Sequence, residues 1–196
     1  MGRERGLRGI ARAWIHVLVR PRTFFASRVR RGDQAPGLTF AVAVAVVFTL
    51  GWLATEPTIV PGIAESKALS AAVVVAVVLA LAAPVGLHLT AAVATLSRLV
   101  ASIEVRDGIR LRERGGVSET VQIVAYASAP LALGGPAIPE LRFVCGVYAV
   151  VLLLVGVRVV HGTSPARTVV AGVPPAVVGY GVGYRVIEAG RTAFGG

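Results

Sequence analysis

Few side chains in the apolar part of this sequence could do chemistry. His88 and Cys145 lie inside long apolar stretches, and His161 follows one of them directly. A proton relay, a protease or a metal site at such a place needs carboxylates, paired histidines or an activated nucleophile. His88 lies in the stretch 68–97 and Cys145 in the stretch 143–157, and neither stretch contains Asp, Glu, Lys or Arg. His161 follows the second stretch. We therefore expect no catalytic residues, no metal and no cofactor.

A structural interpretation of the same three residues is simpler. His88 is expected to be a hydrogen-bonded packing residue, and His161 a group at a helix end beside Arg158. Cys145 is the single cysteine of the chain, so it has no partner for an intramolecular disulfide or a cysteine metal cluster. In an apolar run it is expected to be inert.

The composition indicates which elements must hold these side chains. The chain has 196 residues, of which 55% are hydrophobic and 15% charged, and its mean hydropathy is +0.75. A typical soluble domain is about 45 to 50% apolar and about 25% charged. These values predict an all-α integral membrane protein.

Five stretches are long and apolar enough to be spanning helices, for which roughly 20 residues are needed. They lie at about 38–55, 68–97, 120–138, 142–160 and 166–184, within a membrane domain at 37–185. The third and fourth form a hairpin joined by a Gly/Pro turn, around which we expect the five-helix bundle to be built. Kinks are expected at Pro84 and at Pro174-Pro175. Residues 186–196 are expected to be a short, loose external tail.

The fifth stretch carries a row of small residues suited to close packing of helices. Gly172, Gly179 and Gly183 are predicted packing positions, because a glycine lets two helix backbones approach closely.

Residues 1–36 predict an amphipathic helix lying in the membrane interface. On a helical period, Leu7, Ile10, Trp14 and Ile15 share one face, and arginines occupy the opposite face. The alternative is a disordered basic tail. The residues of this segment predicted to bind lipid or its interface are Arg8, Arg12, Trp14, Arg20, Phe24 and Phe25.

The connection at 98–119 is basic and contains a hairpin signal. Residues 102–113 alternate apolar and polar types around Asp107-Gly108, a pair typical of tight turns. Ser118 is a predicted N-cap for the next helix, with Glu119 near the positive end of its dipole.

The basic residues predict the orientation. The N-terminus, the 98–119 connection and the 158–167 connection hold nine, five and two basic residues, and the remaining segments hold four. The positive-inside rule then places the N-terminus in the cytoplasm and the C-terminus outside the cell membrane. Because arginine avoids every apolar run, we expect no nucleic-acid partner despite the net charge of +10.

The sequence also resembles the Yip family of multi-span membrane proteins, which are named for interaction with Ypt/Rab-type GTPases. The resemblance covers about residues 14–184. Its pattern positions are His88, the Gly115-Gly116 pair with Ser118 and Thr120, Tyr126, Pro130, Ile138 with Pro139, Gly156, Arg158, His161, Gly162 and Ser164. Pro21, Phe24 and Phe25 ahead of the first span add to it. The charged 98–115 connection is longer than the resemblance implies.

This resemblance implies a non-catalytic membrane scaffold with five spans and a cytoplasmic N-terminus. Its implied partners are the lipid bilayer with anionic headgroups and a cytoplasmic protein, in some members a GTPase. The alternative function is a small-solute transporter or channel subunit, because prolines interrupt three spans and broken helices line some transport sites.

Overall fold

The computed structural model describes residues 6–101, 103–105, 109–111 and 116–195. Within this part of the chain, three helices are long and apolar enough to cross a membrane. They are α3 (Ala35–Thr55), the continuous helix Lys67–Ala101, and α7 (Pro139–His161). The protein is therefore an all-helical membrane protein, apart from one short strand pair.

Two further apolar segments run along the bundle but change helix type on the way. Helix α6 (Val117–Ala127) continues as the 3-10 helix η3 (Ala129–Gly134), and α8 (Pro165–Pro175) continues as the π-helix η4 (Ala176–Gly183). Each change occurs at proline, Pro130 in the first case and Pro174-Pro175 in the second. Proline lacks the N–H that an α-helical hydrogen bond needs, so the turn tightens or widens there.

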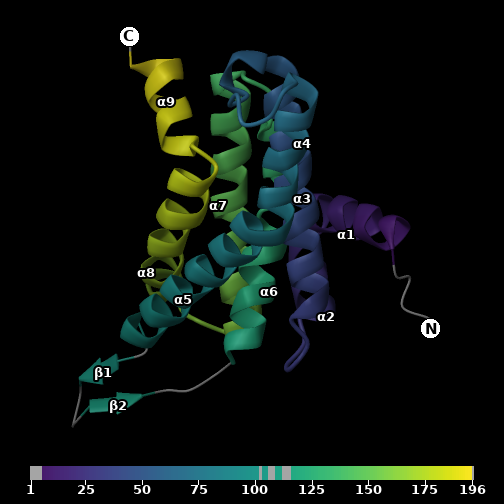
Figure 1. Ribbon diagram of the computed structural model, residues 1–196. Coiled ribbons are helices and arrows are strands. Elements are labelled where there is room, and N and C mark those ends of the chain that lie inside the picture. Colours follow the sequence, from purple (N-terminus) through teal and green to yellow (C-terminus); the bar gives the residue numbers. More distant parts are fainter. Residues whose placement is uncertain (1–5, 102, 106–108, 112–115, 196) are drawn as a thin grey trace.

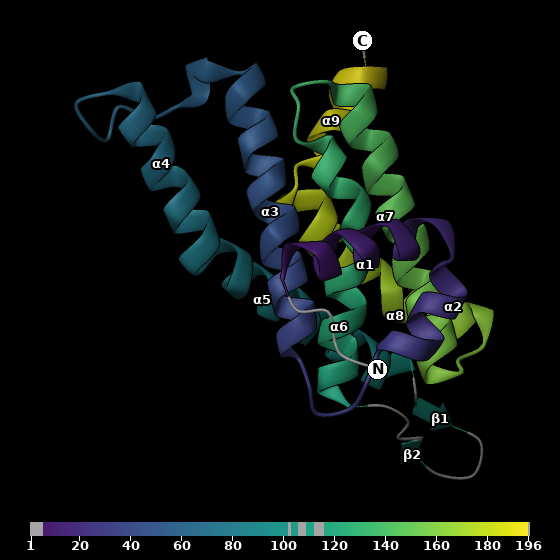
Figure 2. The same ribbon diagram turned by 90° about the vertical axis from the view of Figure 1, so that its right-hand side faces the viewer.

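The helix Lys67–Ala101 also bends at its expected proline. It consists of α4 (Lys67–Val77), the π-helix η2 (Val78–Ala82) and α5 (Ala83–Ala101). The ring of Pro84 would clash with the carbonyl of the residue four positions earlier, and the widened turn at that place removes the clash. Above this bend α4 leans away from α3 (Figure 2).

Helix α6 forms the centre of the bundle. Every residue from Glu119 to Leu131 is buried, because α3, α5 and α7 pack around it. The Tyr180 hydroxyl of η4 donates to the Val124 carbonyl at 2.8 Å. The apolar hairpin of α6 and α7 is thus the core, as its composition predicted (Figure 1).

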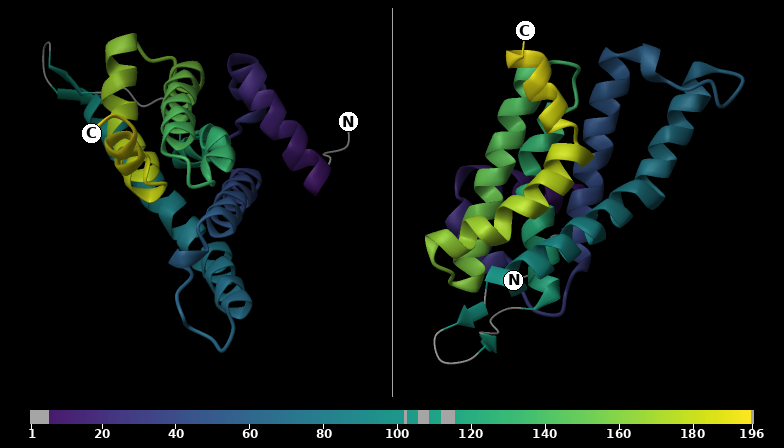
Figure 3. Two further views of the ribbon diagram at one scale, coloured as in Figure 1. Left: turned by 90° about the horizontal axis from the view of Figure 1, so that it is seen from above. Right: turned by 90° about the vertical axis from the view of Figure 1, so that its left-hand side faces the viewer.

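The N-terminal segment is helical and crosses the side of the bundle. Helix α1 (Leu7–Val19) lies across the long helices, and α2 (Pro21–Arg28) follows it (Figures 2 and 3). The buried stripe of α1 is centred on Val17, while Leu7 and Ile15 are exposed, so the apolar face is rotated from the expected one.

The aromatic residues of this segment point into the protein and not outward. Phe24 and Phe25 are each 1% exposed, which corrects their predicted role as lipid anchors. Trp14 donates its Nε1–H to the Ala129 carbonyl at 2.8 Å. Gly156 on α7 explains the burial of Phe25, since any side chain there would meet the Phe25 ring.

The remaining short elements lie at the two ends. Strands β1 (Ile103–Val105) and β2 (Ile109–Leu111) pair antiparallel, with Ile103 opposite Leu111, as the hairpin signal predicted. Asp107, Gly108 and Gly115 lie outside the described residues. The C-terminal tail, expected to be loose, forms α9 (Val186–Phe194), which packs on α7. A turn of 3-10 helix, η1 (Pro57–Ile59), follows α3.

Candidate functional site

The segment that enters α3 is held to the start of α6 by three polar side chains. The Gln122 amide accepts from the Arg30 N–H at 3.2 Å and donates to the Arg30 carbonyl at 2.6 Å. Ser118 accepts from the Gly32 N–H at 2.9 Å, and Glu119 accepts from the Arg31 guanidinium at 3.0 Å. These bonds position the Arg28–Gly32 backbone against the central helix.

Ser118 therefore has a different role from the one predicted. The N-cap of α6 is Gly116, whose N–H is bound by the Glu119 carboxylate. The Ser118 hydroxyl instead accepts a hydrogen bond from the Gly32 N–H of the segment before α3.

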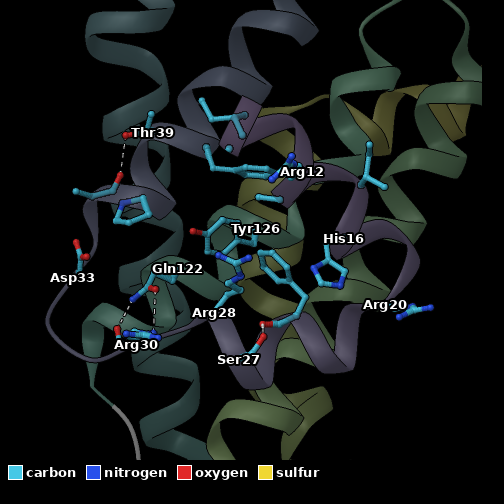
Figure 4. Close-up of a pocket in the computed structure, with 18 of the residues that line it drawn as sticks. Arg12, His16, Arg20, Ser27, Arg28, Arg30, Asp33, Thr39, Gln122 and Tyr126 are labelled. Carbon is cyan, nitrogen blue, oxygen red and sulfur yellow. Dashed lines mark hydrogen bonds between the residues drawn. The ribbon is translucent and has the colours of Figure 1, made fainter. Parts of the chain in front are cut away.

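A cavity of about 1320 Å³ lies between this segment and the helices α1, α2, α3 and α6. Figure 4 shows its lining side chains, with Tyr126 near the middle, Arg20 at one edge and Asp33 at the other. The polar and charged side chains of the lining are Arg12, His16, Arg20, Ser27, Arg28, Arg30, Asp33, Thr39, Gln122 and Tyr126.

The described lining is strongly basic. It carries four guanidinium groups against the one carboxylate of Asp33. Like charges gathered at one cavity repel one another, and an anion placed among them relieves that repulsion. The cavity is therefore suited to bind an anionic ligand.

The inner part of the cavity is aromatic. Tyr126 packs edge-on against Phe24, with ring centroids 4.9 Å apart, and against Phe40 at 5.0 Å. Ile10 and Ala13 of α1 add apolar surface to the opposite wall. Charge and apolar surface thus face the same space.

The predicted lipid-binding residues divide into two groups around this cavity. Arg12 and Arg20 line it, as does Phe24, whereas Arg8 lies outside the lining. Trp14 faces the junction of α6 and η3 through its bond to Ala129.

The family-pattern residues are spread along the bundle. Tyr126 and Gly156 lie in the core, Pro130 begins η3, and Pro139 begins α7. Arg158 is exposed. Gly162 caps the end of α7 with φ of 61°, a conformation that favours glycine.

The two histidines of the pattern differ in environment. His88 is exposed, and its Nδ1 lies 2.7 Å from the Pro84 carbonyl one turn earlier. His161 is buried, and its Nδ1 lies 2.9 Å from the Arg98 guanidinium of α5. Neither faces a metal-binding set, since the described residues contain no group of three potential ligands.

Arg142 is buried at the end of the bundle opposite His161. It donates to the carbonyls of Gly134, Gly135 and Pro136 at 3.0, 3.0 and 3.3 Å. Its guanidinium also lies 5.4 Å from the Trp52 ring. The side chain closes the turn between η3 and α7.

Arg185 also stacks on Trp52, with its guanidinium 4.8 Å from the ring. It also pairs with Glu188, and this hydrogen bond lowers the pKa of Glu188 and raises the pKa of Arg185. Arg185 and Glu188 form this ion pair at the exposed end of the bundle.

Two of the three predicted packing glycines lie at close helix contacts. A Cβ on Gly172 would meet Leu154 of α7, and one on Gly179 would meet Thr90 of α5. A Cβ on Gly183 would lie near only the Val178 carbonyl oxygen, which belongs to the same helix η4.

A second cavity, of about 770 Å³, lies between α3 and the bent helix Lys67–Ala101. Its lining is mostly apolar, with Trp52 and Tyr180 among the aromatic residues, and the described lining carries one charged side chain, Arg185. The leaning of α4 away from α3 produces this space.

Several residues of the basic cavity were not singled out from the sequence, namely Arg28, Arg30 and Gln122. One feature of the sequence could have identified Gln122. Ser118, Gln122 and Tyr126 follow one another at four-residue spacing in a segment that is otherwise apolar after Thr120. Such a polar stripe places all three on one helix face, which here points to the N-terminal segment.

Replacing Gln122 with leucine is expected to release the Arg28–Gly32 segment. Both backbone bonds of Arg30 would be lost, and local opening should become easier by about 1 to 2 kcal/mol. Limited trypsin digestion of the purified protein should then cut at Arg28, Arg30 and Arg31 roughly tenfold faster. Thr39→Val is the control, because the Thr39 hydroxyl bonds only to Ala35 within its own helix. Equal rates in the two variants would contradict the role given to Gln122.

Comparison with known proteins places most of the chain in one family. The family model described as the Yip1 domain matches residues 15–185, from the middle of α1 to the end of η4. No curated protein and no solved structure gave a significant match. The match includes the bonds between Gln122 and Arg30, the hairpin of α6 and α7, and the lining of the basic cavity from Ile15 onward. On this evidence the chain belongs to the Yip1 domain family.

Proposed function

We propose that this protein is a non-catalytic, five-span scaffold that organises the membrane and recruits a partner through its arginine-rich end. The Yip1 family consists of non-enzymatic membrane proteins. The observation that carries the proposal is the docking of a basic helix, α1, across the side of an apolar bundle.

The course of the chain supports five spans. The segments α3, α4–α5, α6–η3, α7 and α8–η4 run alternately up and down the bundle (Figure 1). Residues 117–134 would extend about 30 Å, since an α-helix rises about 1.5 Å per residue and a 3-10 helix about 2.0 Å. That length supports a membrane crossing for α6–η3, although neither helix is long by itself.

The orientation follows from where the basic segments lie. The start of α3, the β1–β2 connection and the α7–α8 connection lie at the same end of the bundle (Figure 1). With the first 34 residues, they hold most of the basic residues, so the positive-inside rule makes this end cytoplasmic.

The depth of α1 suggests how the membrane would be organised. The Tyr148 hydroxyl donates to the Leu18 carbonyl, and Tyr148 lies about 20 Å along α7 from its end at His161. At that level the exposed Arg8 and Arg12 would draw anionic headgroups and water inward. The cytoplasmic leaflet would therefore be thinned locally beside α1.

A cytoplasmic protein partner would meet the same end of the molecule. Strands β1 and β2 extend from the bundle there (Figure 3), and the sequence of residues 98–119 is rich in arginine. An acidic surface is the complementary chemistry, and a GTPase-like partner is what the resemblance to Yip proteins implies.

Reporter fusions in intact cells test this arrangement. Reporters at the N-terminus, in the 102–115 connection and at Thr163 are expected to be cytoplasmic. Reporters at Gly62, at Ala137 and at the C-terminus are expected outside. The physical reason is that five crossings place the two ends of the chain on opposite sides of the membrane. A cytoplasmic C-terminal reporter would require an even number of spans and would overturn the proposal.

A further inference from the structure

We infer that the basic cavity between α1, α2, α3 and α6 binds one anionic phospholipid, with its phosphate among the arginines and its acyl chains toward the aromatic wall. The inference names a ligand for the proposed scaffold. It rests on the proposed function, which places the bundle in a membrane. It assigns a discrete site in place of a diffuse attraction between a basic segment and the membrane surface.

The first argument is charge. Arg12 comes from α1 and Arg28 from α2, so guanidinium groups reach the cavity from two different walls. Guanidinium groups bind phosphate oxygens with two parallel hydrogen bonds, which makes arginine well suited to phosphate. Within the described residues, the guanidinium groups of Arg20 and Arg28 make no hydrogen bond or ion pair, so they have donors left for a ligand.

The second argument is the Tyr126 hydroxyl. Tyr126 is only 6% exposed, yet its hydroxyl makes no hydrogen bond to any residue that the structure describes. Its ring is held between Phe24 and Phe40, and the hydroxyl lies in the open part of the cavity (Figure 4). A tyrosine hydroxyl that faces an open cavity can donate a hydrogen bond to a ligand bound there.

The third argument is the combination of size and surface. Small-molecule sites have volumes of about 300 to 1,000 Å³, and this cavity of about 1320 Å³ exceeds that range. A small soluble phosphate would leave the exposed apolar part of the lining, which includes Ile15 and Val19, in contact with water. A phospholipid fills both parts, since its headgroup is anionic and its chains are apolar.

Lipid titration of the delipidated, detergent-purified full-length protein tests the site. The probes are dioleoyl phosphatidylglycerol, dioleoyl phosphatidylcholine, inorganic phosphate and glycerol phosphate. Bound lipids are counted by native mass spectrometry, and protection is read as the rise in melting temperature. We expect one phosphatidylglycerol bound in preference to phosphatidylcholine, and no protection by the two soluble phosphates.

Two double variants separate the cavity from general surface charge. R12Q/R28Q removes two arginines that line the cavity, and R8Q/R22Q removes two from the same helices that do not. Loss of each charge-assisted hydrogen bond should weaken binding about tenfold, so R12Q/R28Q should bind phosphatidylglycerol far less tightly. R8Q/R22Q should stay within about twofold of the unmodified protein, because its arginines do not reach the ligand.

Two milder variants keep the test decisive if R12Q/R28Q does not fold. Tyr126→Phe removes one hydroxyl, and Thr39→Trp fills the cavity without changing charge. Both are expected to lose phosphatidylglycerol while their melting temperatures without lipid stay close to that of the unmodified protein.

Three results would overturn the inference. They are equal losses in R12Q/R28Q and R8Q/R22Q, undiminished binding by Thr39→Trp, and full protection by inorganic phosphate. Because the titration is done in detergent, its failure would not depend on orientation. The reporter fusions test the proposed function separately.

Discussion

Replacing Arg142 with leucine is expected to lower the free energy of unfolding by roughly 3 kcal/mol. The side chain is 8% exposed and donates to three successive carbonyls of the turn that joins η3 to α7. Leucine would leave these carbonyls without their donor in a place that water reaches poorly. Reversible unfolding with increasing sodium dodecyl sulfate, followed by Trp52 fluorescence, measures the loss.

Two further variants show whether the carbonyl contacts are the cause. Arg142→Lys should recover only part of the stability, since an ammonium group cannot match the fork of donors that the turn uses. Arg185→Gln is the matched control, because it also faces Trp52 but its ion pair with Glu188 is exposed. Its loss should stay below about 1 kcal/mol. A comparable loss in Arg142→Leu and Arg185→Gln would assign the effect to Trp52 and not to the turn.

Replacing Gly135 with alanine is expected to cost about 2 to 3 kcal/mol for a different reason. An added Cβ would lie 3.0 Å from the backbone carbon and Cα of Phe48, and still closer to its carbonyl oxygen. Both partners are backbone, the turn on one side and α3 on the other, so neither can move aside as a side chain would. The same unfolding measurement detects the loss.

Replacing Gly86 with alanine is expected to raise the stability, in contrast to the same change at Gly135. Gly86 is the fourth residue of α5, inside the continuous helix Lys67–Ala101, and an added Cβ there would meet nothing within 4 Å. Alanine has the better helix propensity, so stability should rise by up to about 1 kcal/mol. If both substitutions were neutral, α3 and the turn would not be in the contact that the structure shows.

Much of the bundle followed from the sequence because apolar runs and prolines act locally. The hairpin of α6 and α7 was expected at the centre, and the bend near Pro84 was placed within one turn. The strand pair β1–β2 was recognised from its alternation. Each of these depends on neighbours a few residues away, which a single sequence displays.

The N-terminal segment shows where local patterns failed. Its periodicity predicted a helix with an apolar face, and α1 has one, but the face is rotated and buries Val17. Phe24 and Phe25 were assigned to lipid because aromatic residues are common at membrane interfaces. Whether an aromatic ring meets lipid or protein depends on a gap elsewhere in the fold, here the one that Gly156 leaves on α7.

By itself, the sequence determined that this chain belongs in a membrane, that its apolar segments are helical, and that most of its basic residues lie outside the apolar runs. These properties follow from composition and from the period of a helix. Only the tertiary structure brought Arg12, Arg28, Gln122 and Tyr126 to one cavity and turned Arg142 inward. The reason for the cavity is that its walls come from segments about 100 residues apart, and their distance in space depends on packing that no local pattern encodes.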